Sequence, residues 1–233
     1  MSDNHKLEIL QESAESKQQL AYQQLRNDIL NNIYPEGTVL TERKLCEIYS
    51  VSRSPIRNAL QQLTHEGLLS LIPGKGATVV GFSIEDILEV YDLIEMMQLH
   101  ALQALEGHID EAFLLGLTEL LSHMQQTSQA GDIAASTKWD QQFHHFLITA
   151  AGSRRLASMY EQLHMQSIRF MATSAKDDAA LAARSCQEHA QICACIQAGD
   201  LAGAGQGLRE HYRNIRQYYI DRLIHRGSGC SSL

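Results

Sequence analysis

The segment VSRSPIRNALQQL, residues Val51–Leu63, decides the fold of the first third of this 233-residue chain. Its apolar residues recur at helical spacing and predict a buried face made of Ile56, Ala59, Leu60 and Leu63. The opposite face carries Arg53, Ser54, Arg57, Asn58 and Gln61. Guanidinium, hydroxyl and amide groups are the side chains that contact phosphates and base edges. The segment therefore predicts a helix that packs on one side and faces DNA on the other.

The flanking residues extend this helix into a motif. Residues 18–33 predict an amphipathic helix with an inward face of Tyr22, Leu25, Ile29 and Ile33. Thr41 can cap a short second helix that turns Leu45, Ile48 and Tyr49 inward. After Gly67, two β-prone runs flank the turn residues 73–76 and predict a hairpin. Three helices followed by a hairpin make a winged helix-turn-helix.

The pattern changes at Ser83. No proline follows Pro73, strand signals vanish, and helical periodicity predicts about six helices between residues 83 and 224. Their short connections indicate antiparallel neighbours. The predicted fold is therefore mainly α, with a winged helix-turn-helix at 17–80 and an all-α, six-helix antiparallel bundle at 81–226. We expect a flexible arm at 1–16 and a disordered tail at 227–233.

The charge is distributed unevenly. The formal net charge is −8, yet residues 17–80 balance to +2 whereas residues 81–233 balance to −7. A mildly basic first domain suits a phosphate-facing surface. No apolar run is long enough to span a bilayer, and the first residues lack the apolar core of a signal peptide. The five cysteines form no CxxC pair. We therefore expect a cytoplasmic protein with free thiols and no membrane partner.

The bundle holds a possible metal site. Asp140 and His144 lie four residues apart and share a helix face. His189 and His211 lie on the last two predicted helices. One carboxylate oxygen and three imidazole nitrogens suit a divalent ion, zinc first, with nickel and manganese as alternatives. Bundles often assemble such sites from facing helices.

Two alternatives compete with this interpretation. The chain has eleven histidines, so the four residues could form a polar pocket without a metal. A metal at this site could also activate water in a metal-dependent hydrolase. However, no further carboxylate is spaced as a general base, and a DNA reader has no purpose in a hydrolase. We therefore expect that the protein is not an enzyme.

Three segments of the first domain resemble the N-terminal domain of GntR-family transcriptional regulators: residues 40–46, residues 51–60 and Glu66-Gly67-Leu68-Leu69. Residues 74–79 resemble the wing of that family. The resemblance implies a sequence-specific regulator, with repression as the family-level expectation. The implied operator contacts are Arg43, Ser52, Arg53, Ser54 and Arg57, with Gly74 at the wing tip entering the minor groove. Lys75 lies beside Gly74, where glycines let the wing approach the DNA backbone closely.

Residues 83–224 resemble the FCD ligand-binding domain of the FadR subfamily. The resemblance rests on Asp140-x-x-x-His144, Ala150-Ala151-Gly152, Glu188-His189 with Ile192, Gly199-Asp200, and His211. It implies a metal held by Asp140, His144, His189 and His211. It also implies a homodimer on a two-fold operator and a small-molecule effector, such as a carboxylate, that shifts the spacing of the two winged helices. Six bundle helices resemble the VanR-like branch more than the seven-helix FadR type.

The chain departs from the family in its effector pocket. Ile94 and Gln98 stand where members often carry an arginine and a glutamate, and Ser153 replaces an asparagine. The family arginine often helps to hold a carboxylate effector, so its absence argues against a simple organic acid bound in that way. Arg169 on the fourth bundle helix offers a substitute cation. We therefore take Arg169 and Gln98 as candidate effector-binding residues.

Overall fold

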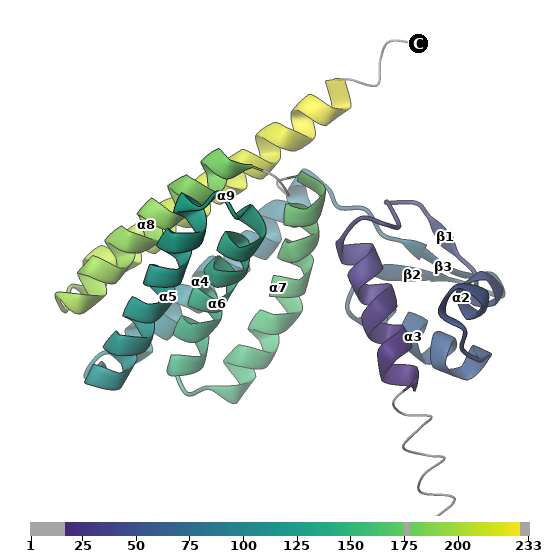
Figure 1. The fold of residues 1–233 in the computed structure, drawn as a ribbon, viewed down its shortest axis with the longest axis horizontal. Coiled ribbons are helices and arrows are strands. Elements are labelled where there is room, and N and C mark those ends of the chain that lie inside the picture. Colours follow the sequence, from purple (N-terminus) through teal and green to yellow (C-terminus); the bar gives the residue numbers. More distant parts are fainter. Residues whose placement is uncertain (1–16, 175–177, 229–233) are drawn as a thin grey trace, which may run out of the picture. The chain divides into compact units, whose positions relative to one another are not determined.

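The computed structural model describes residues 17–174 and 178–228 (Figure 1). The chain divides into two compact units between Phe82 and Ser83. The arm expected at 1–16 lies outside the described residues, as do positions 229–233 of the expected tail. Residues 227 and 228 still belong to the last helix, so the expected start of the tail at 227 is wrong.

The first unit is a winged helix-turn-helix. A helix over residues 17–30 precedes β1 (Val39–Leu40), α2 (Glu42–Tyr49) and α3 (Arg53–His65), which are followed by β2 (Leu69–Ile72) and β3 (Gly76–Val79). The antiparallel sheet has the order β1-β3-β2, with Val39 opposite Thr78. The predicted motif is confirmed with one strand more than expected. β1 was missed because two residues are too few to show an alternating pattern.

The predicted buried face of α3 is confirmed, because all four of its apolar residues are buried with Leu45 of α2 and Leu68. Three other expectations were wrong. Ile33 lies beyond the end of the first helix and is 63% exposed, and Ile48 is 48% exposed because it lies off the face of α2 that buries Leu45. Asn58 donates from Nδ2 to Oε1 of Gln18 at 2.9 Å, so it packs against the first helix and leaves the outer face.

The second unit is a bundle of six described helices, as predicted. These are α4 (Ile84–Ala104), α5 (Glu111–Gln129), α6 (Ile133–Ala150), α7 (Arg154–Ser174), α8 (Ala179–Gln197) and α9 (Leu201–Ser228). Ser83 and Asp86 form a capping box on α4, while Asp110, Asp132 and Asp178 cap α5, α6 and α8. In Figure 1, α8 and α9 run along each other beside α4 and α5. None of the helices described is both long and apolar enough to cross a membrane.

The bundle core is apolar except in one region. Phe143, Leu147, Ile192 and Leu208 are fully buried. Among them lie three buried histidines, His144, His189 and His211, together with Gln98. Polar groups in an apolar core destabilise the fold unless they are paired or bind a ligand. This buried polar region is therefore the candidate ligand site of the bundle.

Candidate metal centre and DNA-facing groove

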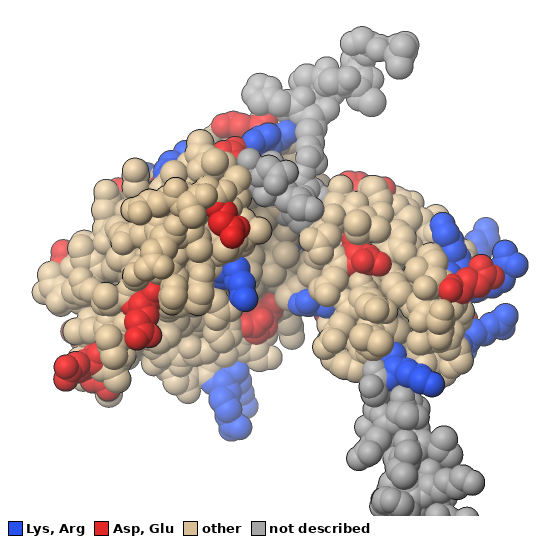
Figure 2. Space-filling model, in the orientation of Figure 1, with Lys and Arg blue, Asp and Glu red and all other residues tan. Residues whose placement is uncertain are grey.

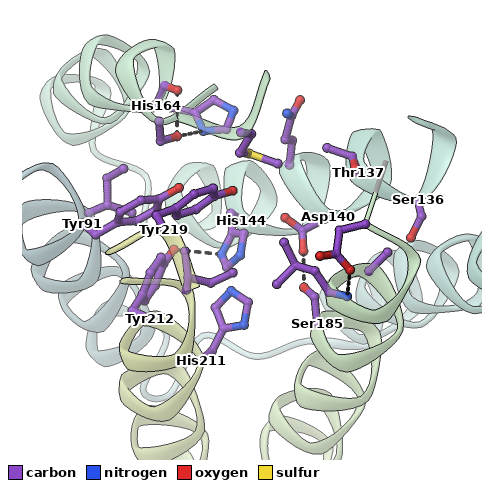
Figure 3. A pocket seen from close by; sticks show the side chains of 18 of the residues that line it. Tyr91, Ser136, Thr137, Asp140, His144, His164, Ser185, His211, Tyr212 and Tyr219 are labelled. Carbon is purple, nitrogen blue, oxygen red and sulfur yellow. Dashed lines mark hydrogen bonds between the residues drawn. The ribbon is translucent and has the colours of Figure 1, made fainter. Parts of the chain in front are cut away.

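The structure brings Asp140, His144, His189 and His211 together in the bundle core. One possible ligand atom of each lies within 4.8 Å of those of the other three. α6 supplies Asp140 and His144, one turn apart, while α8 and α9 each supply one histidine. Figure 3 shows His144 between the tyrosines on one side and Asp140 on the other, with His211 close by.

Each of the three imidazoles has an outer polar partner at Nδ1. Nδ1 of His144 lies 3.1 Å from the hydroxyl of Tyr212, and Nδ1 of His211 lies 2.7 Å from Oε2 of Glu188. Nδ1 of His189 lies 3.4 Å from the hydroxyl of Ser185 and also 3.4 Å from Oδ1 of Asp140. Nε2 of His144 and Nε2 of His189 approach each other to 3.1 Å. The Nε2 atoms of His144 and His189 are thus placed close enough to share one ion.

Two outer residues hold the carboxylates. Ser185 donates from its hydroxyl to Oδ1 of Asp140 at 2.5 Å. Glu188 accepts from Nδ2 of Asn214 at 2.7 Å, and its second oxygen meets His211. Metal-binding histidines usually have such partners, which fix the ring orientation and the tautomer.

Burial favours the neutral forms of two histidines of the cluster, His144 and His189. Burial lowers the pKa of His144 and the pKa of His189 well below the ordinary value, and the charge of His211 adds to both shifts. Burial also raises the pKa of Asp140, against the opposing effects of His211 and Ser185. For Glu188 burial acts to raise the pKa, but the bonds from His211 and Asn214 bring it below its ordinary value. Metal binding needs neutral imidazoles and a charged carboxylate, so burial favours the ligand forms of His144 and His189 and opposes that of Asp140.

These residues fit a divalent cation. The four ligand atoms are nitrogen and oxygen, they converge from three helices, and the three histidines are buried. Two carboxylates, Asp140 within the set and Glu188 behind it, would balance the two positive charges of the ion. The donor set does not choose between zinc, nickel and manganese, because all three accept it.

The cluster forms one wall of a cavity. The space open to the centre of a water molecule is about 70 Å³, enough for several waters or a small organic molecule. Asp140, His144 and His211 line it at one side. Much of the remaining lining is phenolic or apolar, with Tyr91, Tyr160, Tyr212 and Tyr219 among Ile94, Met124, Ile133, Met171, Leu181 and Ile215. Polar side chains also line it, namely Ser136, Thr137, Gln141, Ser167, Asp178 and Ser185. His164 also lines the cavity and stacks on Tyr160 at 5.3 Å.

The two effector candidates lie outside this lining. Arg169 is buried, but it is not among the residues that line the cavity. Gln98 is also buried and donates from Nε2 to the backbone oxygen of His144 at 2.9 Å, so it supports the metal-site helix. Ile94 does line the cavity at the position of the family arginine. Within the described part of the chain, no lysine or arginine lines the cavity.

The first unit presents a groove between the start of α2, the outer face of α3 and the wing. We call it the recognition groove. Five of the predicted DNA contacts line it, namely Arg43, Arg53, Arg57, Gly74 and Lys75. Ser52 and Ser54 are exposed at the start of α3 but do not line the groove. Figure 2 shows basic side chains gathered at this end of the unit. Their convergence gives the unit a positive edge suited to phosphates.

Sequence reasoning missed several residues of these sites. Ser185 and Glu188 act behind the histidines, and Tyr212 is the neighbour of a predicted ligand in the chain. A search for polar residues four positions before each histidine would have found Ser185. Glu42 was also missed as a residue of the recognition groove, where it pairs with Arg57.

Comparison with known families matches both units. The FCD domain matches residues 89–214, and the gntR family of bacterial regulatory proteins matches residues 17–79. The chain is 30% identical over 148 residues to the uncharacterized HTH-type transcriptional regulator YdhC of Bacillus subtilis. This alignment covers 61% of this chain and 64% of the relative. It is 30% identical over 141 residues to the gluconate operon transcriptional repressor of Bacillus licheniformis, with 60% and 57% covered. The chain thus spans less than two thirds of the length of these two relatives.

A third relative is matched over more of its length. The HTH-type transcriptional repressor GlaR of Escherichia coli is 26% identical, with 82% of this chain and 90% of the relative covered. These relatives give no support to a metal-dependent hydrolase.

Two solved structures share the fold. A transcriptional regulator from Rhodococcus sp. RHA1 has a TM-score of 0.75 at 19% identity, covering 88% of this chain and 98% of that one. A metal-free FCD domain of another regulator has a TM-score of 0.53 at 22% identity, covering 62% and 99%. The FCD match alone covers more than half of the residues. The chain therefore belongs to the GntR family of bacterial regulatory proteins, with a GntR winged helix-turn-helix followed by an FCD domain.

Proposed function

We propose that this protein is a sequence-specific transcriptional repressor that binds a two-fold operator as a homodimer and responds to a small acid bound at a metal in its bundle. The observation that carries the proposal is the pairing of two sites in one chain. One is the recognition groove, with Arg43, Arg53, Arg57, Gly74 and Lys75. The other is the Asp/His cluster on the wall of a cavity.

The metal is proposed to be divalent and held by Asp140, His144, His189 and His211. Four protein ligands complete a tetrahedral zinc site, but an ion that takes five or six ligands would keep a position on the cavity side for a carboxylate oxygen of the effector. The name of one relative, a gluconate operon repressor, supports a small hydroxy acid as the effector class. The tyrosines that line the cavity offer hydroxyls to such a molecule.

The bundle of six described helices supports a place in the VanR-like branch. Action in the cytoplasm is part of the same proposal, because it follows from the proposed binding to operator DNA. For regulation, the effector must bind the DNA-competent and the DNA-incompetent arrangement of the dimer with different affinity. Ligand binding at the cavity would then change how the two winged units are spaced.

The test uses the purified full chain loaded with zinc. Selection from a random duplex pool is expected to enrich a two-fold sequence, and binding should weaken steeply as salt rises. Elemental analysis should find about one metal per chain, and His189→Ala should lose most of it. Failure to enrich any sequence contradicts the DNA-binding half, and equal metal content in the two proteins contradicts the ligand set.

A further inference from the structure

Arg57 of the recognition groove is held by a carboxylate. Glu42, the first residue of α2, accepts from Nε of Arg57 at 2.8 Å and from Nη2 at 2.9 Å. This bidentate pair joins α2 to α3 across fifteen positions of the chain. Both residues line the recognition groove, where the Arg57 side chain is 60% exposed and the Glu42 side chain 27% exposed.

The pair leaves a defined edge of the guanidinium open. A guanidinium has five N–H groups in a planar fork. Glu42 occupies Nε and one hydrogen of Nη2, so the remaining three hydrogens lie on Nη1 and at the far side of Nη2. That terminal edge is the one that can donate to O6 and N7 of a guanine together. The Glu42 carboxylate, bound at Nε and Nη2, thus fixes the direction in which Nη1 and the outer hydrogen of Nη2 point.

The position of Glu42 is otherwise unfavourable for a protein that binds phosphates. It places a negative charge in the groove that also holds Arg43, Arg53 and Lys75. Repulsion from phosphates weakens binding to every DNA sequence alike. A negative charge in the groove benefits a regulator only if it lowers the affinity for other DNA more than the affinity for the operator.

We propose that Glu42 is a positioning residue for Arg57, which holds the guanidinium as a guanine reader and keeps it from pairing with phosphates. Glu42 then sets the ratio of specific to non-specific DNA binding. The proposal rests on the DNA-binding function proposed above. It assigns a guanine to each half-site of the operator, opposite the end of Arg57.

A simpler role for Glu42 is the favourable interaction of an acid with the first turn of a helix. That role predicts a loss of stability and no change in the specificity ratio. Glu47 provides a matched control, because it lies on the same helix, is exposed, and among the described residues pairs with Arg43 alone, at 4.0 Å.

The experiment compares Glu42→Gln, Glu42→Asp and Glu47→Gln in the full chain. Affinity is measured by fluorescence anisotropy on the duplex selected by the wild type, on the same duplex with its half-site guanines replaced, and on a scrambled duplex. Glu42→Gln is expected to lower the ratio of specific to scrambled affinity about tenfold, in line with the loss of one bidentate base contact. Glu42→Asp keeps the charge but shortens the side chain, and we expect a similar loss. Glu47→Gln should leave the ratio unchanged.

A double-mutant cycle isolates the coupling. In an Arg57→Ala background, Glu42→Gln is expected to leave the ratio as it is. Two results would overturn the role of Glu42 and leave the DNA-binding function standing. One is a ratio of specific to scrambled affinity that Glu42→Gln does not change, and the other is a ratio that Glu42→Gln lowers equally with and without Arg57. A wild-type protein that selects no sequence overturns both. Thermal unfolding of each variant shows whether a lower specificity ratio is caused by a loss of stability. If Glu42→Gln does not fold, the specificity ratio of Glu42→Asp tests the proposal in its place.

Discussion

The hydroxyl of Tyr212 lies 3.1 Å from Nδ1 of His144, whose Nε2 lies 3.1 Å from Nε2 of His189. A neutral imidazole carries one proton, so the two ring nitrogens of His144 cannot act alike. When Nε2 of His144 binds a metal, its proton sits on Nδ1 and is donated to the oxygen of Tyr212. The Tyr212 hydroxyl can accept from Nδ1–H of His144, and in that arrangement Nε2 of His144 would carry the free lone pair that a metal needs.

Tyr212→Phe is expected to weaken metal binding about tenfold, because the outer partner of a histidine ligand contributes roughly 10- to 100-fold in affinity. Competition with a chromophoric chelator measures this. Tyr218→Phe is the control, since Tyr218 lies on the same helix but donates to Asp178 instead of the cluster. Equal metal affinities in the two variants would show that Tyr212 does not orient His144.

Glu188→Gln tests the second outer partner. Glu188 accepts at 2.7 Å from His211 and at 2.7 Å from Asn214. An amide keeps the size but removes a negative charge beside the ion, so we expect a loss of metal affinity of about tenfold or more. The matched control is Glu161→Gln, at a half-buried residue that lies 2.9 Å from His145 and outside the cluster. The prediction fails if chelator competition gives both variants the wild-type affinity.

The sequence predicted the four residues of this cluster because family motifs and helical spacing are local features. Asp140 and His144 are one turn apart, and each remaining histidine lies in a recognisable motif. The partners at Nδ1 were not predicted, because Tyr212 and Ser185 carry no motif of their own and act only after α6, α8 and α9 have packed. The predictions that Ile48 points inward and that Asn58 lies on the outer face were wrong for a similar reason. Periodicity describes one helix, and it does not say which neighbouring helix covers each face.

The pH dependence of stability is set in part by Asp178 at the start of α8. The Tyr218 hydroxyl, the backbone N–H of Leu181 and the Arg222 guanidinium all donate to its carboxylate, and they lower its pKa from 3.8 to about 2. A depressed pKa in the folded state means that the charged carboxylate stabilises the fold above pH 4, and that this contribution is lost as pH falls toward 2.

Asp178→Asn keeps a good helix cap but removes this charge. We expect the variant to lose about 1 kcal/mol of unfolding free energy at pH 7, a modest value because the pair with Arg222 is partly exposed to solvent. The difference from wild type should shrink between pH 4 and pH 2. Urea unfolding across this range measures it, with Asp221→Asn, an exposed position on α9, as the control. A difference that stays constant to pH 2 would assign the effect to something other than this carboxylate.

Gly76, the first residue of β3, is required by the close approach of β1. Its φ is +113°, and a Cβ added there would lie 2.1 Å from the backbone oxygen of Leu40. Gly74 at the wing tip also has a positive φ of +70°, but nothing lies within 4 Å of an added Cβ. The two glycines therefore separate the cost of backbone conformation from the cost of a clash.

Gly74→Ala is expected to destabilise the winged unit by about 1 kcal/mol, the cost of a left-handed conformation for an L residue. Gly76→Ala should cost at least about 3 kcal/mol, since the clash is with backbone and the strand pair must separate. Hydrogen exchange of the amides in β1 and β3 of the full chain reports this directly, because opening of the sheet exposes them. Equal protection in the two variants would mean that β1 contributes little to the wing. In that case the third strand would be incidental to the way the wing is held beside α3.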